Sequence, residues 1–117
     1  MHSPDFNAHG FLRVAASTPV VSIADPMANA GAILAQLEDL TEQQVAVAVF
    51  PELCLSGYSA EDLFFTEKLL DDCRQALALL AERSQLPLCA VGMPWRLADG
   101  RLLNCAAVIG NGRVLGM

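Results

Sequence analysis

Short apolar runs recur along the chain and predict five strands. They occupy residues 11–17, 45–50, 86–92, 102–109 and 113–117. A continuous run without polar alternation, such as VAVAVF at 45–50, is typical of a strand buried on both faces. Between the last two runs stands Asn111-Gly112, a dipeptide that favours a tight hairpin turn. The end of the chain therefore predicts an antiparallel pair.

Two longer segments between the first three strands predict amphipathic helices. The first begins at Asp25-Pro26, with Asp as N-cap and Pro at the first helical position. Ser59 and Asp62 stand three residues apart, as in a capping box, and predict a short helical segment before the second helix. The expected apolar faces are Met27, Ala30, Leu34, Leu37 and Leu40 in the first helix, and Leu69, Leu70, Cys73, Leu77 and Leu80 in the second.

The expected order of elements is β-α-β-α-β-β-β, which predicts an α/β fold with a parallel core and antiparallel strands added at the end. All 117 residues are assigned to one domain. The last strand runs to Met117 without a capping residue, so we expect the chain to be the front part of a larger domain. A chain that is 54 % hydrophobic and 17 % charged fits that expectation.

The charge pattern disfavours whole classes of partner. The formal net charge is −6 and the seven basic residues are scattered, so neither nucleic acid nor an anionic membrane is an expected partner. No apolar run approaches the roughly 20 residues of a membrane span. The polar N-terminus has no hydrophobic core of a signal peptide, and we expect a cytoplasmic protein.

Glu52 is the most unusual residue in this pattern, because it follows a buried strand directly. In open α/β sheets, ligands bind beyond the carboxyl ends of parallel strands. A carboxylate ringed there by Phe50, Leu53 and Leu55 would be desolvated and suited to act as a general base. The alternative is that Glu52 turns to solvent and caps the following turn. The spacing alone leaves both open.

Other catalytic patterns find less support. The first strand is followed by STPVVS, without the glycines of a dinucleotide-binding loop, and the chain has no GxSxG and no phosphate-loop lysine. Cys54 stands two residues from Glu52, so the two side chains share a face if the segment is extended. Packing as a small apolar residue remains the simpler interpretation of Cys54.

The four cysteines favour reduced thiols over a disulfide framework or a metal site. They stand at 54, 73, 89 and 105 without a CxxC pair, and three lie in apolar segments. His2 and His9 are both in the N-terminal arm, away from them, so no metal site is expected.

The string FPELCLSGYSAEDLF at 50–64 resembles the glutamate motif of the nitrilase (carbon–nitrogen hydrolase) superfamily. HGFLRVAAS at 9–17, ADPMANA at 24–30 and LLNCAAVIGNGRVLGM at 102–117 are similar to the N-terminal glutaminase domain of the glutamine-dependent NAD(+) synthetase family. The resemblance covers nearly the whole chain. It implies the front part of a nitrilase-type α-β-β-α sandwich, with a mixed sheet and helices on one face.

The resemblance also implies a Glu-Lys-Cys triad that hydrolyses the amide of glutamine. Only the general base carries over, as Glu52, and Tyr58 of the SGY string is implied to line the glutamine pocket. The triad lysine and cysteine have no counterpart, because the single lysine, Lys68, falls on a predicted helix and no cysteine matches. We therefore expect residues 1–117 alone to be inactive.

In the family, ammonia passes to a C-terminal synthetase domain that uses ATP and Mg to amidate deamido-NAD. The resemblance thus implies glutamine and that domain as partners, no cofactor for this part, and a homo-oligomer. Two other interpretations stay open: part of a stand-alone amidase of the same superfamily, and a non-catalytic interaction module that pairs through its sheet edge.

Overall fold

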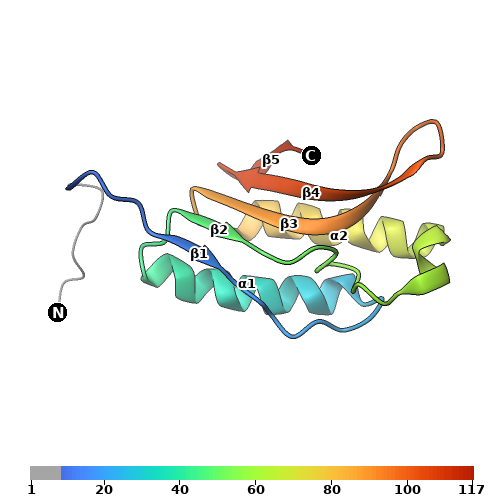
Figure 1. Cartoon of the computed structure of the whole chain (residues 1–117), viewed down its shortest axis with the longest axis horizontal. Helices are drawn as coiled ribbons and strands as arrows, with labels where there is room; N and C mark the ends of the chain where they lie inside the picture. The colour runs from blue at the N-terminus through green and yellow to red at the C-terminus, as the bar shows by residue number, and fades with distance from the viewer. Residues whose placement is uncertain (1–8) are drawn as a thin grey trace.

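The computed structural model describes residues 9–117, and its strands form one sheet in the order β1-β2-β3-β4-β5 (Figure 1). The strands are β1 (Val14–Ala16), β2 (Val47–Val49), β3 (Leu88–Arg96), β4 (Leu102–Gly110) and β5 (Arg113–Gly116). The first three are parallel, whereas β4 and β5 pair antiparallel. The mixed sheet predicted from the sequence is confirmed.

The lengths of β1, β2 and β3 differ most from the predicted ones. β1 and β2 keep only three residues each, and Pro51, which has no N–H to donate, follows β2 closely. β3 does not end at Gly92, because antiparallel pairing with β4 continues through Arg96 opposite Leu102. The predicted hairpin between β4 and β5 forms at Asn111-Gly112, where both residues have positive φ, as a type I′ turn requires.

Helix α1 (Pro26–Glu42) begins as predicted. The Asp25 side chain accepts a hydrogen bond from Ala28 N at 3.2 Å, which satisfies one of the free N–H groups of the first turn. The buried face was predicted less well. Met27 is 47 % exposed, while the centre of the face is Ile33, because the stripe that meets the sheet is rotated towards Ala30, Ile33 and Leu37.

Helix α2 (Glu67–Arg83) buries all five predicted residues. Its N-cap is Thr66, whose hydroxyl accepts from Leu69 N at 3.4 Å. The short segment before it is a 3₁₀ helix, η2 (Glu61–Phe65), and here the predicted capping box is wrong. The cap position is Ala60 rather than Ser59, and a methyl group cannot accept a hydrogen bond.

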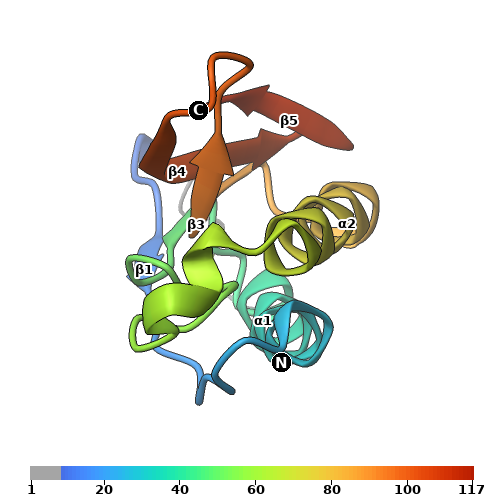
Figure 2. The same cartoon turned by 90° about the vertical axis from the view of Figure 1, so that its right-hand side faces the viewer.

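Both long helices cover the same face of the sheet (Figure 2), as the sequence resemblance implied. The core lies between the helices and that face. It is formed by Ala30, Ile33, Leu37, Ala48, Cys73, Leu77, Leu80, Cys89, Val91, Met93, Ala107 and Ile109, among others. Neither long helix covers the opposite face, where Val49 is 52 % exposed. Within residues 9–117, neither helix combines the length and apolarity needed to cross a membrane.

Candidate active site

Glu52 lies on a tight turn, residues 51–55, which follows β2 and folds onto β3; we call this segment the elbow. Phe50 N donates to Ala90 O at 2.9 Å, and Leu55 N donates to Gly92 O at 3.1 Å. The elbow is thus fastened to β3 on both sides of Glu52. Between these two bonds the chain reverses at Leu53, whose φ is +53°. A leucine rarely adopts this conformation, and such strain concentrates at functional sites.

Gly92 makes this close approach possible. A Cβ atom on Gly92 would lie 2.3 Å from Leu53 N, 2.6 Å from Pro51 O and 2.8 Å from the Glu52 carbonyl carbon. No side chain fits in that space, so the backbone of the elbow rests directly on the backbone of β3. A glycine inside a strand commonly marks such a contact.

Asn29 fixes the far end of the elbow to helix α1. This side chain is only 2 % exposed. Its Nδ2 donates to Leu55 O and to Ser22 O, each at 2.8 Å, and its Oδ1 accepts from Ser22 N at 2.7 Å. One buried amide therefore joins α1, the segment before it and the elbow, with its hydrogen-bonding groups satisfied as burial requires.

The Glu52 side chain points to the sheet face that the helices leave uncovered, and Asn104 Nδ2 on β4 donates a hydrogen bond to its Oε1. Glu52 is exposed, so the predicted ring of apolar neighbours is wrong for the described residues. Phe50 and Leu55 turn instead into the core, at 5 % and 0 % exposure. The elbow causes this, because it sends Glu52 to one side of the chain and Phe50 and Leu55 to the other, while Leu53 stays half-buried.

A concavity of about 380 Å³ lies beside this carboxylate. Its walls come from the end of β2, the elbow, β3 and β4, with Glu52 and Asn104 as the polar side chains. The remaining lining residues are Val49, Phe50, Pro51, Ala90, Val91, Gly92, Cys105 and Ala106. A carboxylate and an amide in an otherwise apolar hollow can hold a small polar substrate and accept a proton from it.

Tyr58 follows the elbow on an exposed turn. Gly57, in front of it, has φ +87°, and Tyr58 is 70 % exposed. Tyr58 is not among the residues that line the concavity beside Glu52. Its role in a glutamine pocket stays a prediction.

Cys54 points away from Glu52 into the core, with 2 % exposure and an Sγ–Gly92 O distance of 3.7 Å. The segment is a turn rather than extended, so residues 52 and 54 do not share a face. Burial raises the pKa of the Cys54 thiol, which opposes thiolate formation. The interpretation as a packing residue is confirmed by this burial, and the same interpretation holds for the buried Cys73 and Cys89, whereas Cys105 is half-buried.

The other residues singled out for chemistry lie elsewhere. Lys68 is on α2, as predicted, where it pairs with Asp72 at 2.9 Å. His2 lies outside the described residues. Among residues 9–117, no group of three or more His, Cys, Asp or Glu side chains is placed to hold a metal ion.

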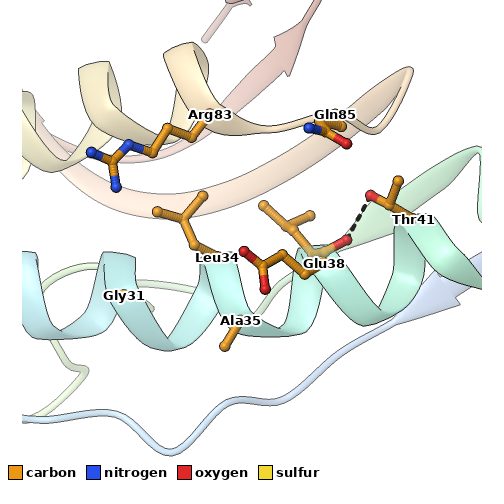
Figure 3. Close-up of a pocket in the computed structure, with 8 residues that line it drawn as sticks. Gly31, Leu34, Ala35, Glu38, Thr41, Arg83 and Gln85 are labelled. Atoms are coloured by element: carbon orange, nitrogen blue, oxygen red, sulfur yellow. Dashed lines mark hydrogen bonds between the residues drawn. The ribbon is translucent and has the colours of Figure 1, made fainter.

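A second hollow, of about 340 Å³, lies between α1 and α2 on the helix layer (Figure 3). Glu38 and Arg83 are its charged residues, and Thr41 donates to the Leu37 carbonyl of its own helix at 2.7 Å. The hollow contains no cysteine, histidine or serine. It belongs to the opposite layer from Glu52, and its one hydroxyl, on Thr41, is engaged by the Leu37 carbonyl.

The carbon–nitrogen hydrolase family model matches residues 13–116, so this chain belongs to the carbon–nitrogen hydrolase family. Named relatives are more specific than the family model. The glutamine-dependent NAD(+) synthetases of Mycobacterium bovis and Mycobacterium leprae are 46 % and 41 % identical to it over 111 and 112 residues. These matches cover 93 % and 94 % of the chain but only 16 % of each relative's length.

Solved structures agree with this assignment. A glutamine-dependent NAD(+) synthetase from Cytophaga hutchinsonii superimposes with a TM-score of 0.84 at 28 % identity, covering 90 % of this chain and 18 % of that one. An amidase from Nesterenkonia sp. AN1 gives 0.74 at 20 % identity, over 91 % of this chain and 42 % of the amidase. The second likeness shows the shared fold alone. The fold class expected from the sequence is confirmed.

Sequence reasoning missed Gly92, Asn29 and Asn104 as parts of the site. Two of them carried a signal. Gly92 interrupts an apolar strand, and Asn104 is the polar residue in the apolar run LLNCAAVI. Asn29 carried none, because an asparagine in an amphipathic helix is ordinarily exposed.

Proposed function

We propose that this chain provides the general base of a glutamine amidohydrolase, which supplies ammonia for ATP-dependent synthesis of NAD from deamido-NAD. The observation that carries the proposal is the position of Glu52, on a strained elbow fastened to β3 at both ends, beside a concavity. The relatives support it, because the matched proteins are glutamine-dependent NAD(+) synthetases.

In this function Glu52 removes a proton from a cysteine thiol, and the thiolate attacks the carboxamide carbon of glutamine. A lysine stabilises the negative charge on the oxygen. The amide nitrogen takes the proton from Glu52 and leaves as ammonia when the carbon–nitrogen bond breaks, and water then hydrolyses the thioester to release glutamate and the thiol. Residues 1–117 hold only the glutamate of this set. We therefore expect residues 1–117 alone not to hydrolyse glutamine, and Tyr58 to contribute to the glutamine pocket.

The wider setting is part of the same proposal. The partners are glutamine and a synthetase domain that binds ATP and Mg, while the amidohydrolase part needs no cofactor. The protein assembles as a homo-oligomer in the cytoplasm. Neither nucleic acid nor a membrane is a partner, given the acidic net charge of −6.

The test is Glu52→Gln in the full-length gene product, with NAD formation measured separately with glutamine and with ammonium as the nitrogen source. Glutamine at this position keeps the shape and an oxygen that can accept from Asn104, but cannot take up the proton. We expect the glutamine-dependent rate to fall by about 10²–10⁴-fold while the ammonia-dependent rate persists.

The matched control is Glu82→Gln, an exposed glutamate on α2, which should leave both rates unchanged. Loss of both rates in Glu52→Gln, or of neither, would contradict the proposal. Reading the codons that follow Met117 gives an independent check, since the proposal requires a lysine and a cysteine in matching positions there.

A further inference from the structure

We infer that Asn104 is a positioning residue for Glu52, which holds one carboxylate oxygen so that the other faces the substrate. This inference rests on the proposed function of Glu52. The first observation is the hydrogen bond itself, in which Asn104 Nδ2 donates to Glu52 Oε1. Among the described residues, Asn104 is the one side chain that forms a hydrogen bond or ion pair with the Glu52 carboxylate.

The sheet register explains why Asn104 reaches Glu52. On β4, Asn104 is opposite Pro94 and Ala106 is opposite Gly92. Side chains two residues apart on a strand share a face, so Asn104 and Ala106 project from the face that carries the elbow. Gly92 and Ala106 present almost no side chain there. The elbow therefore lies close to the sheet. The amide of Asn104, which is the diagonal neighbour of Gly92 across the β3–β4 pair, can reach Glu52 there.

Asn104 also separates two hollows. It lines the concavity beside Glu52 and, on its other side, an apolar hollow of about 220 Å³ formed with Leu53, Phe64 and Phe65, among others. Asn104 therefore forms one edge of the concavity in which the substrate would bind. The bond engages Oε1 and leaves the second oxygen of Glu52 free to accept a proton. Glu52 lines the larger concavity and not the apolar hollow.

A purely structural role is disfavoured by exposure. Asn104 and Glu52 are both exposed, so neither needs the other to satisfy a buried polar group, and an exposed hydrogen bond contributes little to stability. Orientation matters far more to rate, because small misplacements of a catalytic group cost large factors. The bond should therefore affect catalysis much more than folding.

The experiment compares Asn104→Leu, which keeps the size and removes the donor, with Asn104→Gln, which restores a donor on a longer side chain. The full-length protein is assayed with glutamine and with ammonium. For Asn104→Leu we expect the glutamine-dependent kcat to fall about 10- to 100-fold, with little change in the KM for glutamine, an unchanged ammonia-dependent rate and an unchanged melting temperature. Asn104→Gln should recover part of the kcat.

Gln85→Leu is the matched control, an exposed amide just before β3, and should leave both rates unchanged. An unaltered kcat in Asn104→Leu, or no recovery in Asn104→Gln beside a large loss in Asn104→Leu, would overturn the inference. The Glu52→Gln variant distinguishes a failure of the inference about Asn104 from a failure of the proposed function. If Glu52→Gln abolishes glutamine use while Asn104→Leu does not, only the positioning role is wrong.

Discussion

Asn104 donates a hydrogen bond to Glu52 although the two residues are 52 positions apart and β2, which leads to Glu52, is not a neighbour of β4 in the sheet. Strand β3 lies between them, and the bond forms because Gly92 lets the elbow of β2 lie across β3. The site is therefore a property of three strands together.

Gly92→Ala should displace the elbow. The added methyl would lie 2.3 Å from Leu53 N, a backbone atom that cannot move alone. We expect the free energy of unfolding to fall by about 1–3 kcal/mol, as for other overpacked sites, and the glutamine-dependent rate to fall more than the ammonia-dependent rate. Thermal denaturation and the two assays measure these effects.

The control for this substitution is Gly31→Ala on α1, where a new Cβ meets nothing within 4 Å. Replacing a glycine inside a helix stabilises it by about 0.5–1 kcal/mol. Equal melting temperatures for the two variants would show that the contact at Gly92 is not close.

The buried cysteines should resist alkylation in the native protein. Burial, reinforced by the negative charge of Asp72, raises the pKa of Cys73 from 9.0 to about 12, and burial also raises those of Cys54 and Cys89. Only the thiolate reacts. At pH 8 we expect iodoacetamide to label the half-buried Cys105 first, as mass spectrometry of digested protein would report.

The same shift makes folding sensitive to alkaline pH. The folded state binds the Cys73 proton more tightly than the unfolded chain, so its contribution to stability is complete below pH 9 and is lost as pH rises from 9 towards 12. Cys73→Ala should reduce this alkaline loss. Labelling of Cys73 as fast as that of Cys105 at pH 8 would contradict both expectations.

Tyr58→Phe should weaken glutamine binding without changing the chemical step. The ring stays and only the hydroxyl is lost, so one hydrogen bond of about 0.5–1.5 kcal/mol disappears, equivalent to a roughly 2- to 10-fold higher KM for glutamine. Steady-state kinetics of the full-length protein measure this directly. An unchanged KM would remove Tyr58 from the pocket.

The sequence by itself determined the elements and the identity of the candidate base. Local rules suffice where the cause is local. Asp25-Pro26 starts α1, Asn111-Gly112 makes the hairpin, and the apolar stripe of α2 is buried at every predicted position. The SGY string and the carboxylate after a buried strand were enough to single out Glu52.

Only the tertiary structure decided how Glu52 is presented. The turn at Leu53 sends the carboxylate out and Cys54 in, which no rule for extended segments predicts. The space above Gly92, the buried amide of Asn29 and the reach of Asn104 each depend on contacts between distant segments. Such contacts are fixed by the register of the sheet and the packing of α1 against it, and local sequence preferences do not encode either.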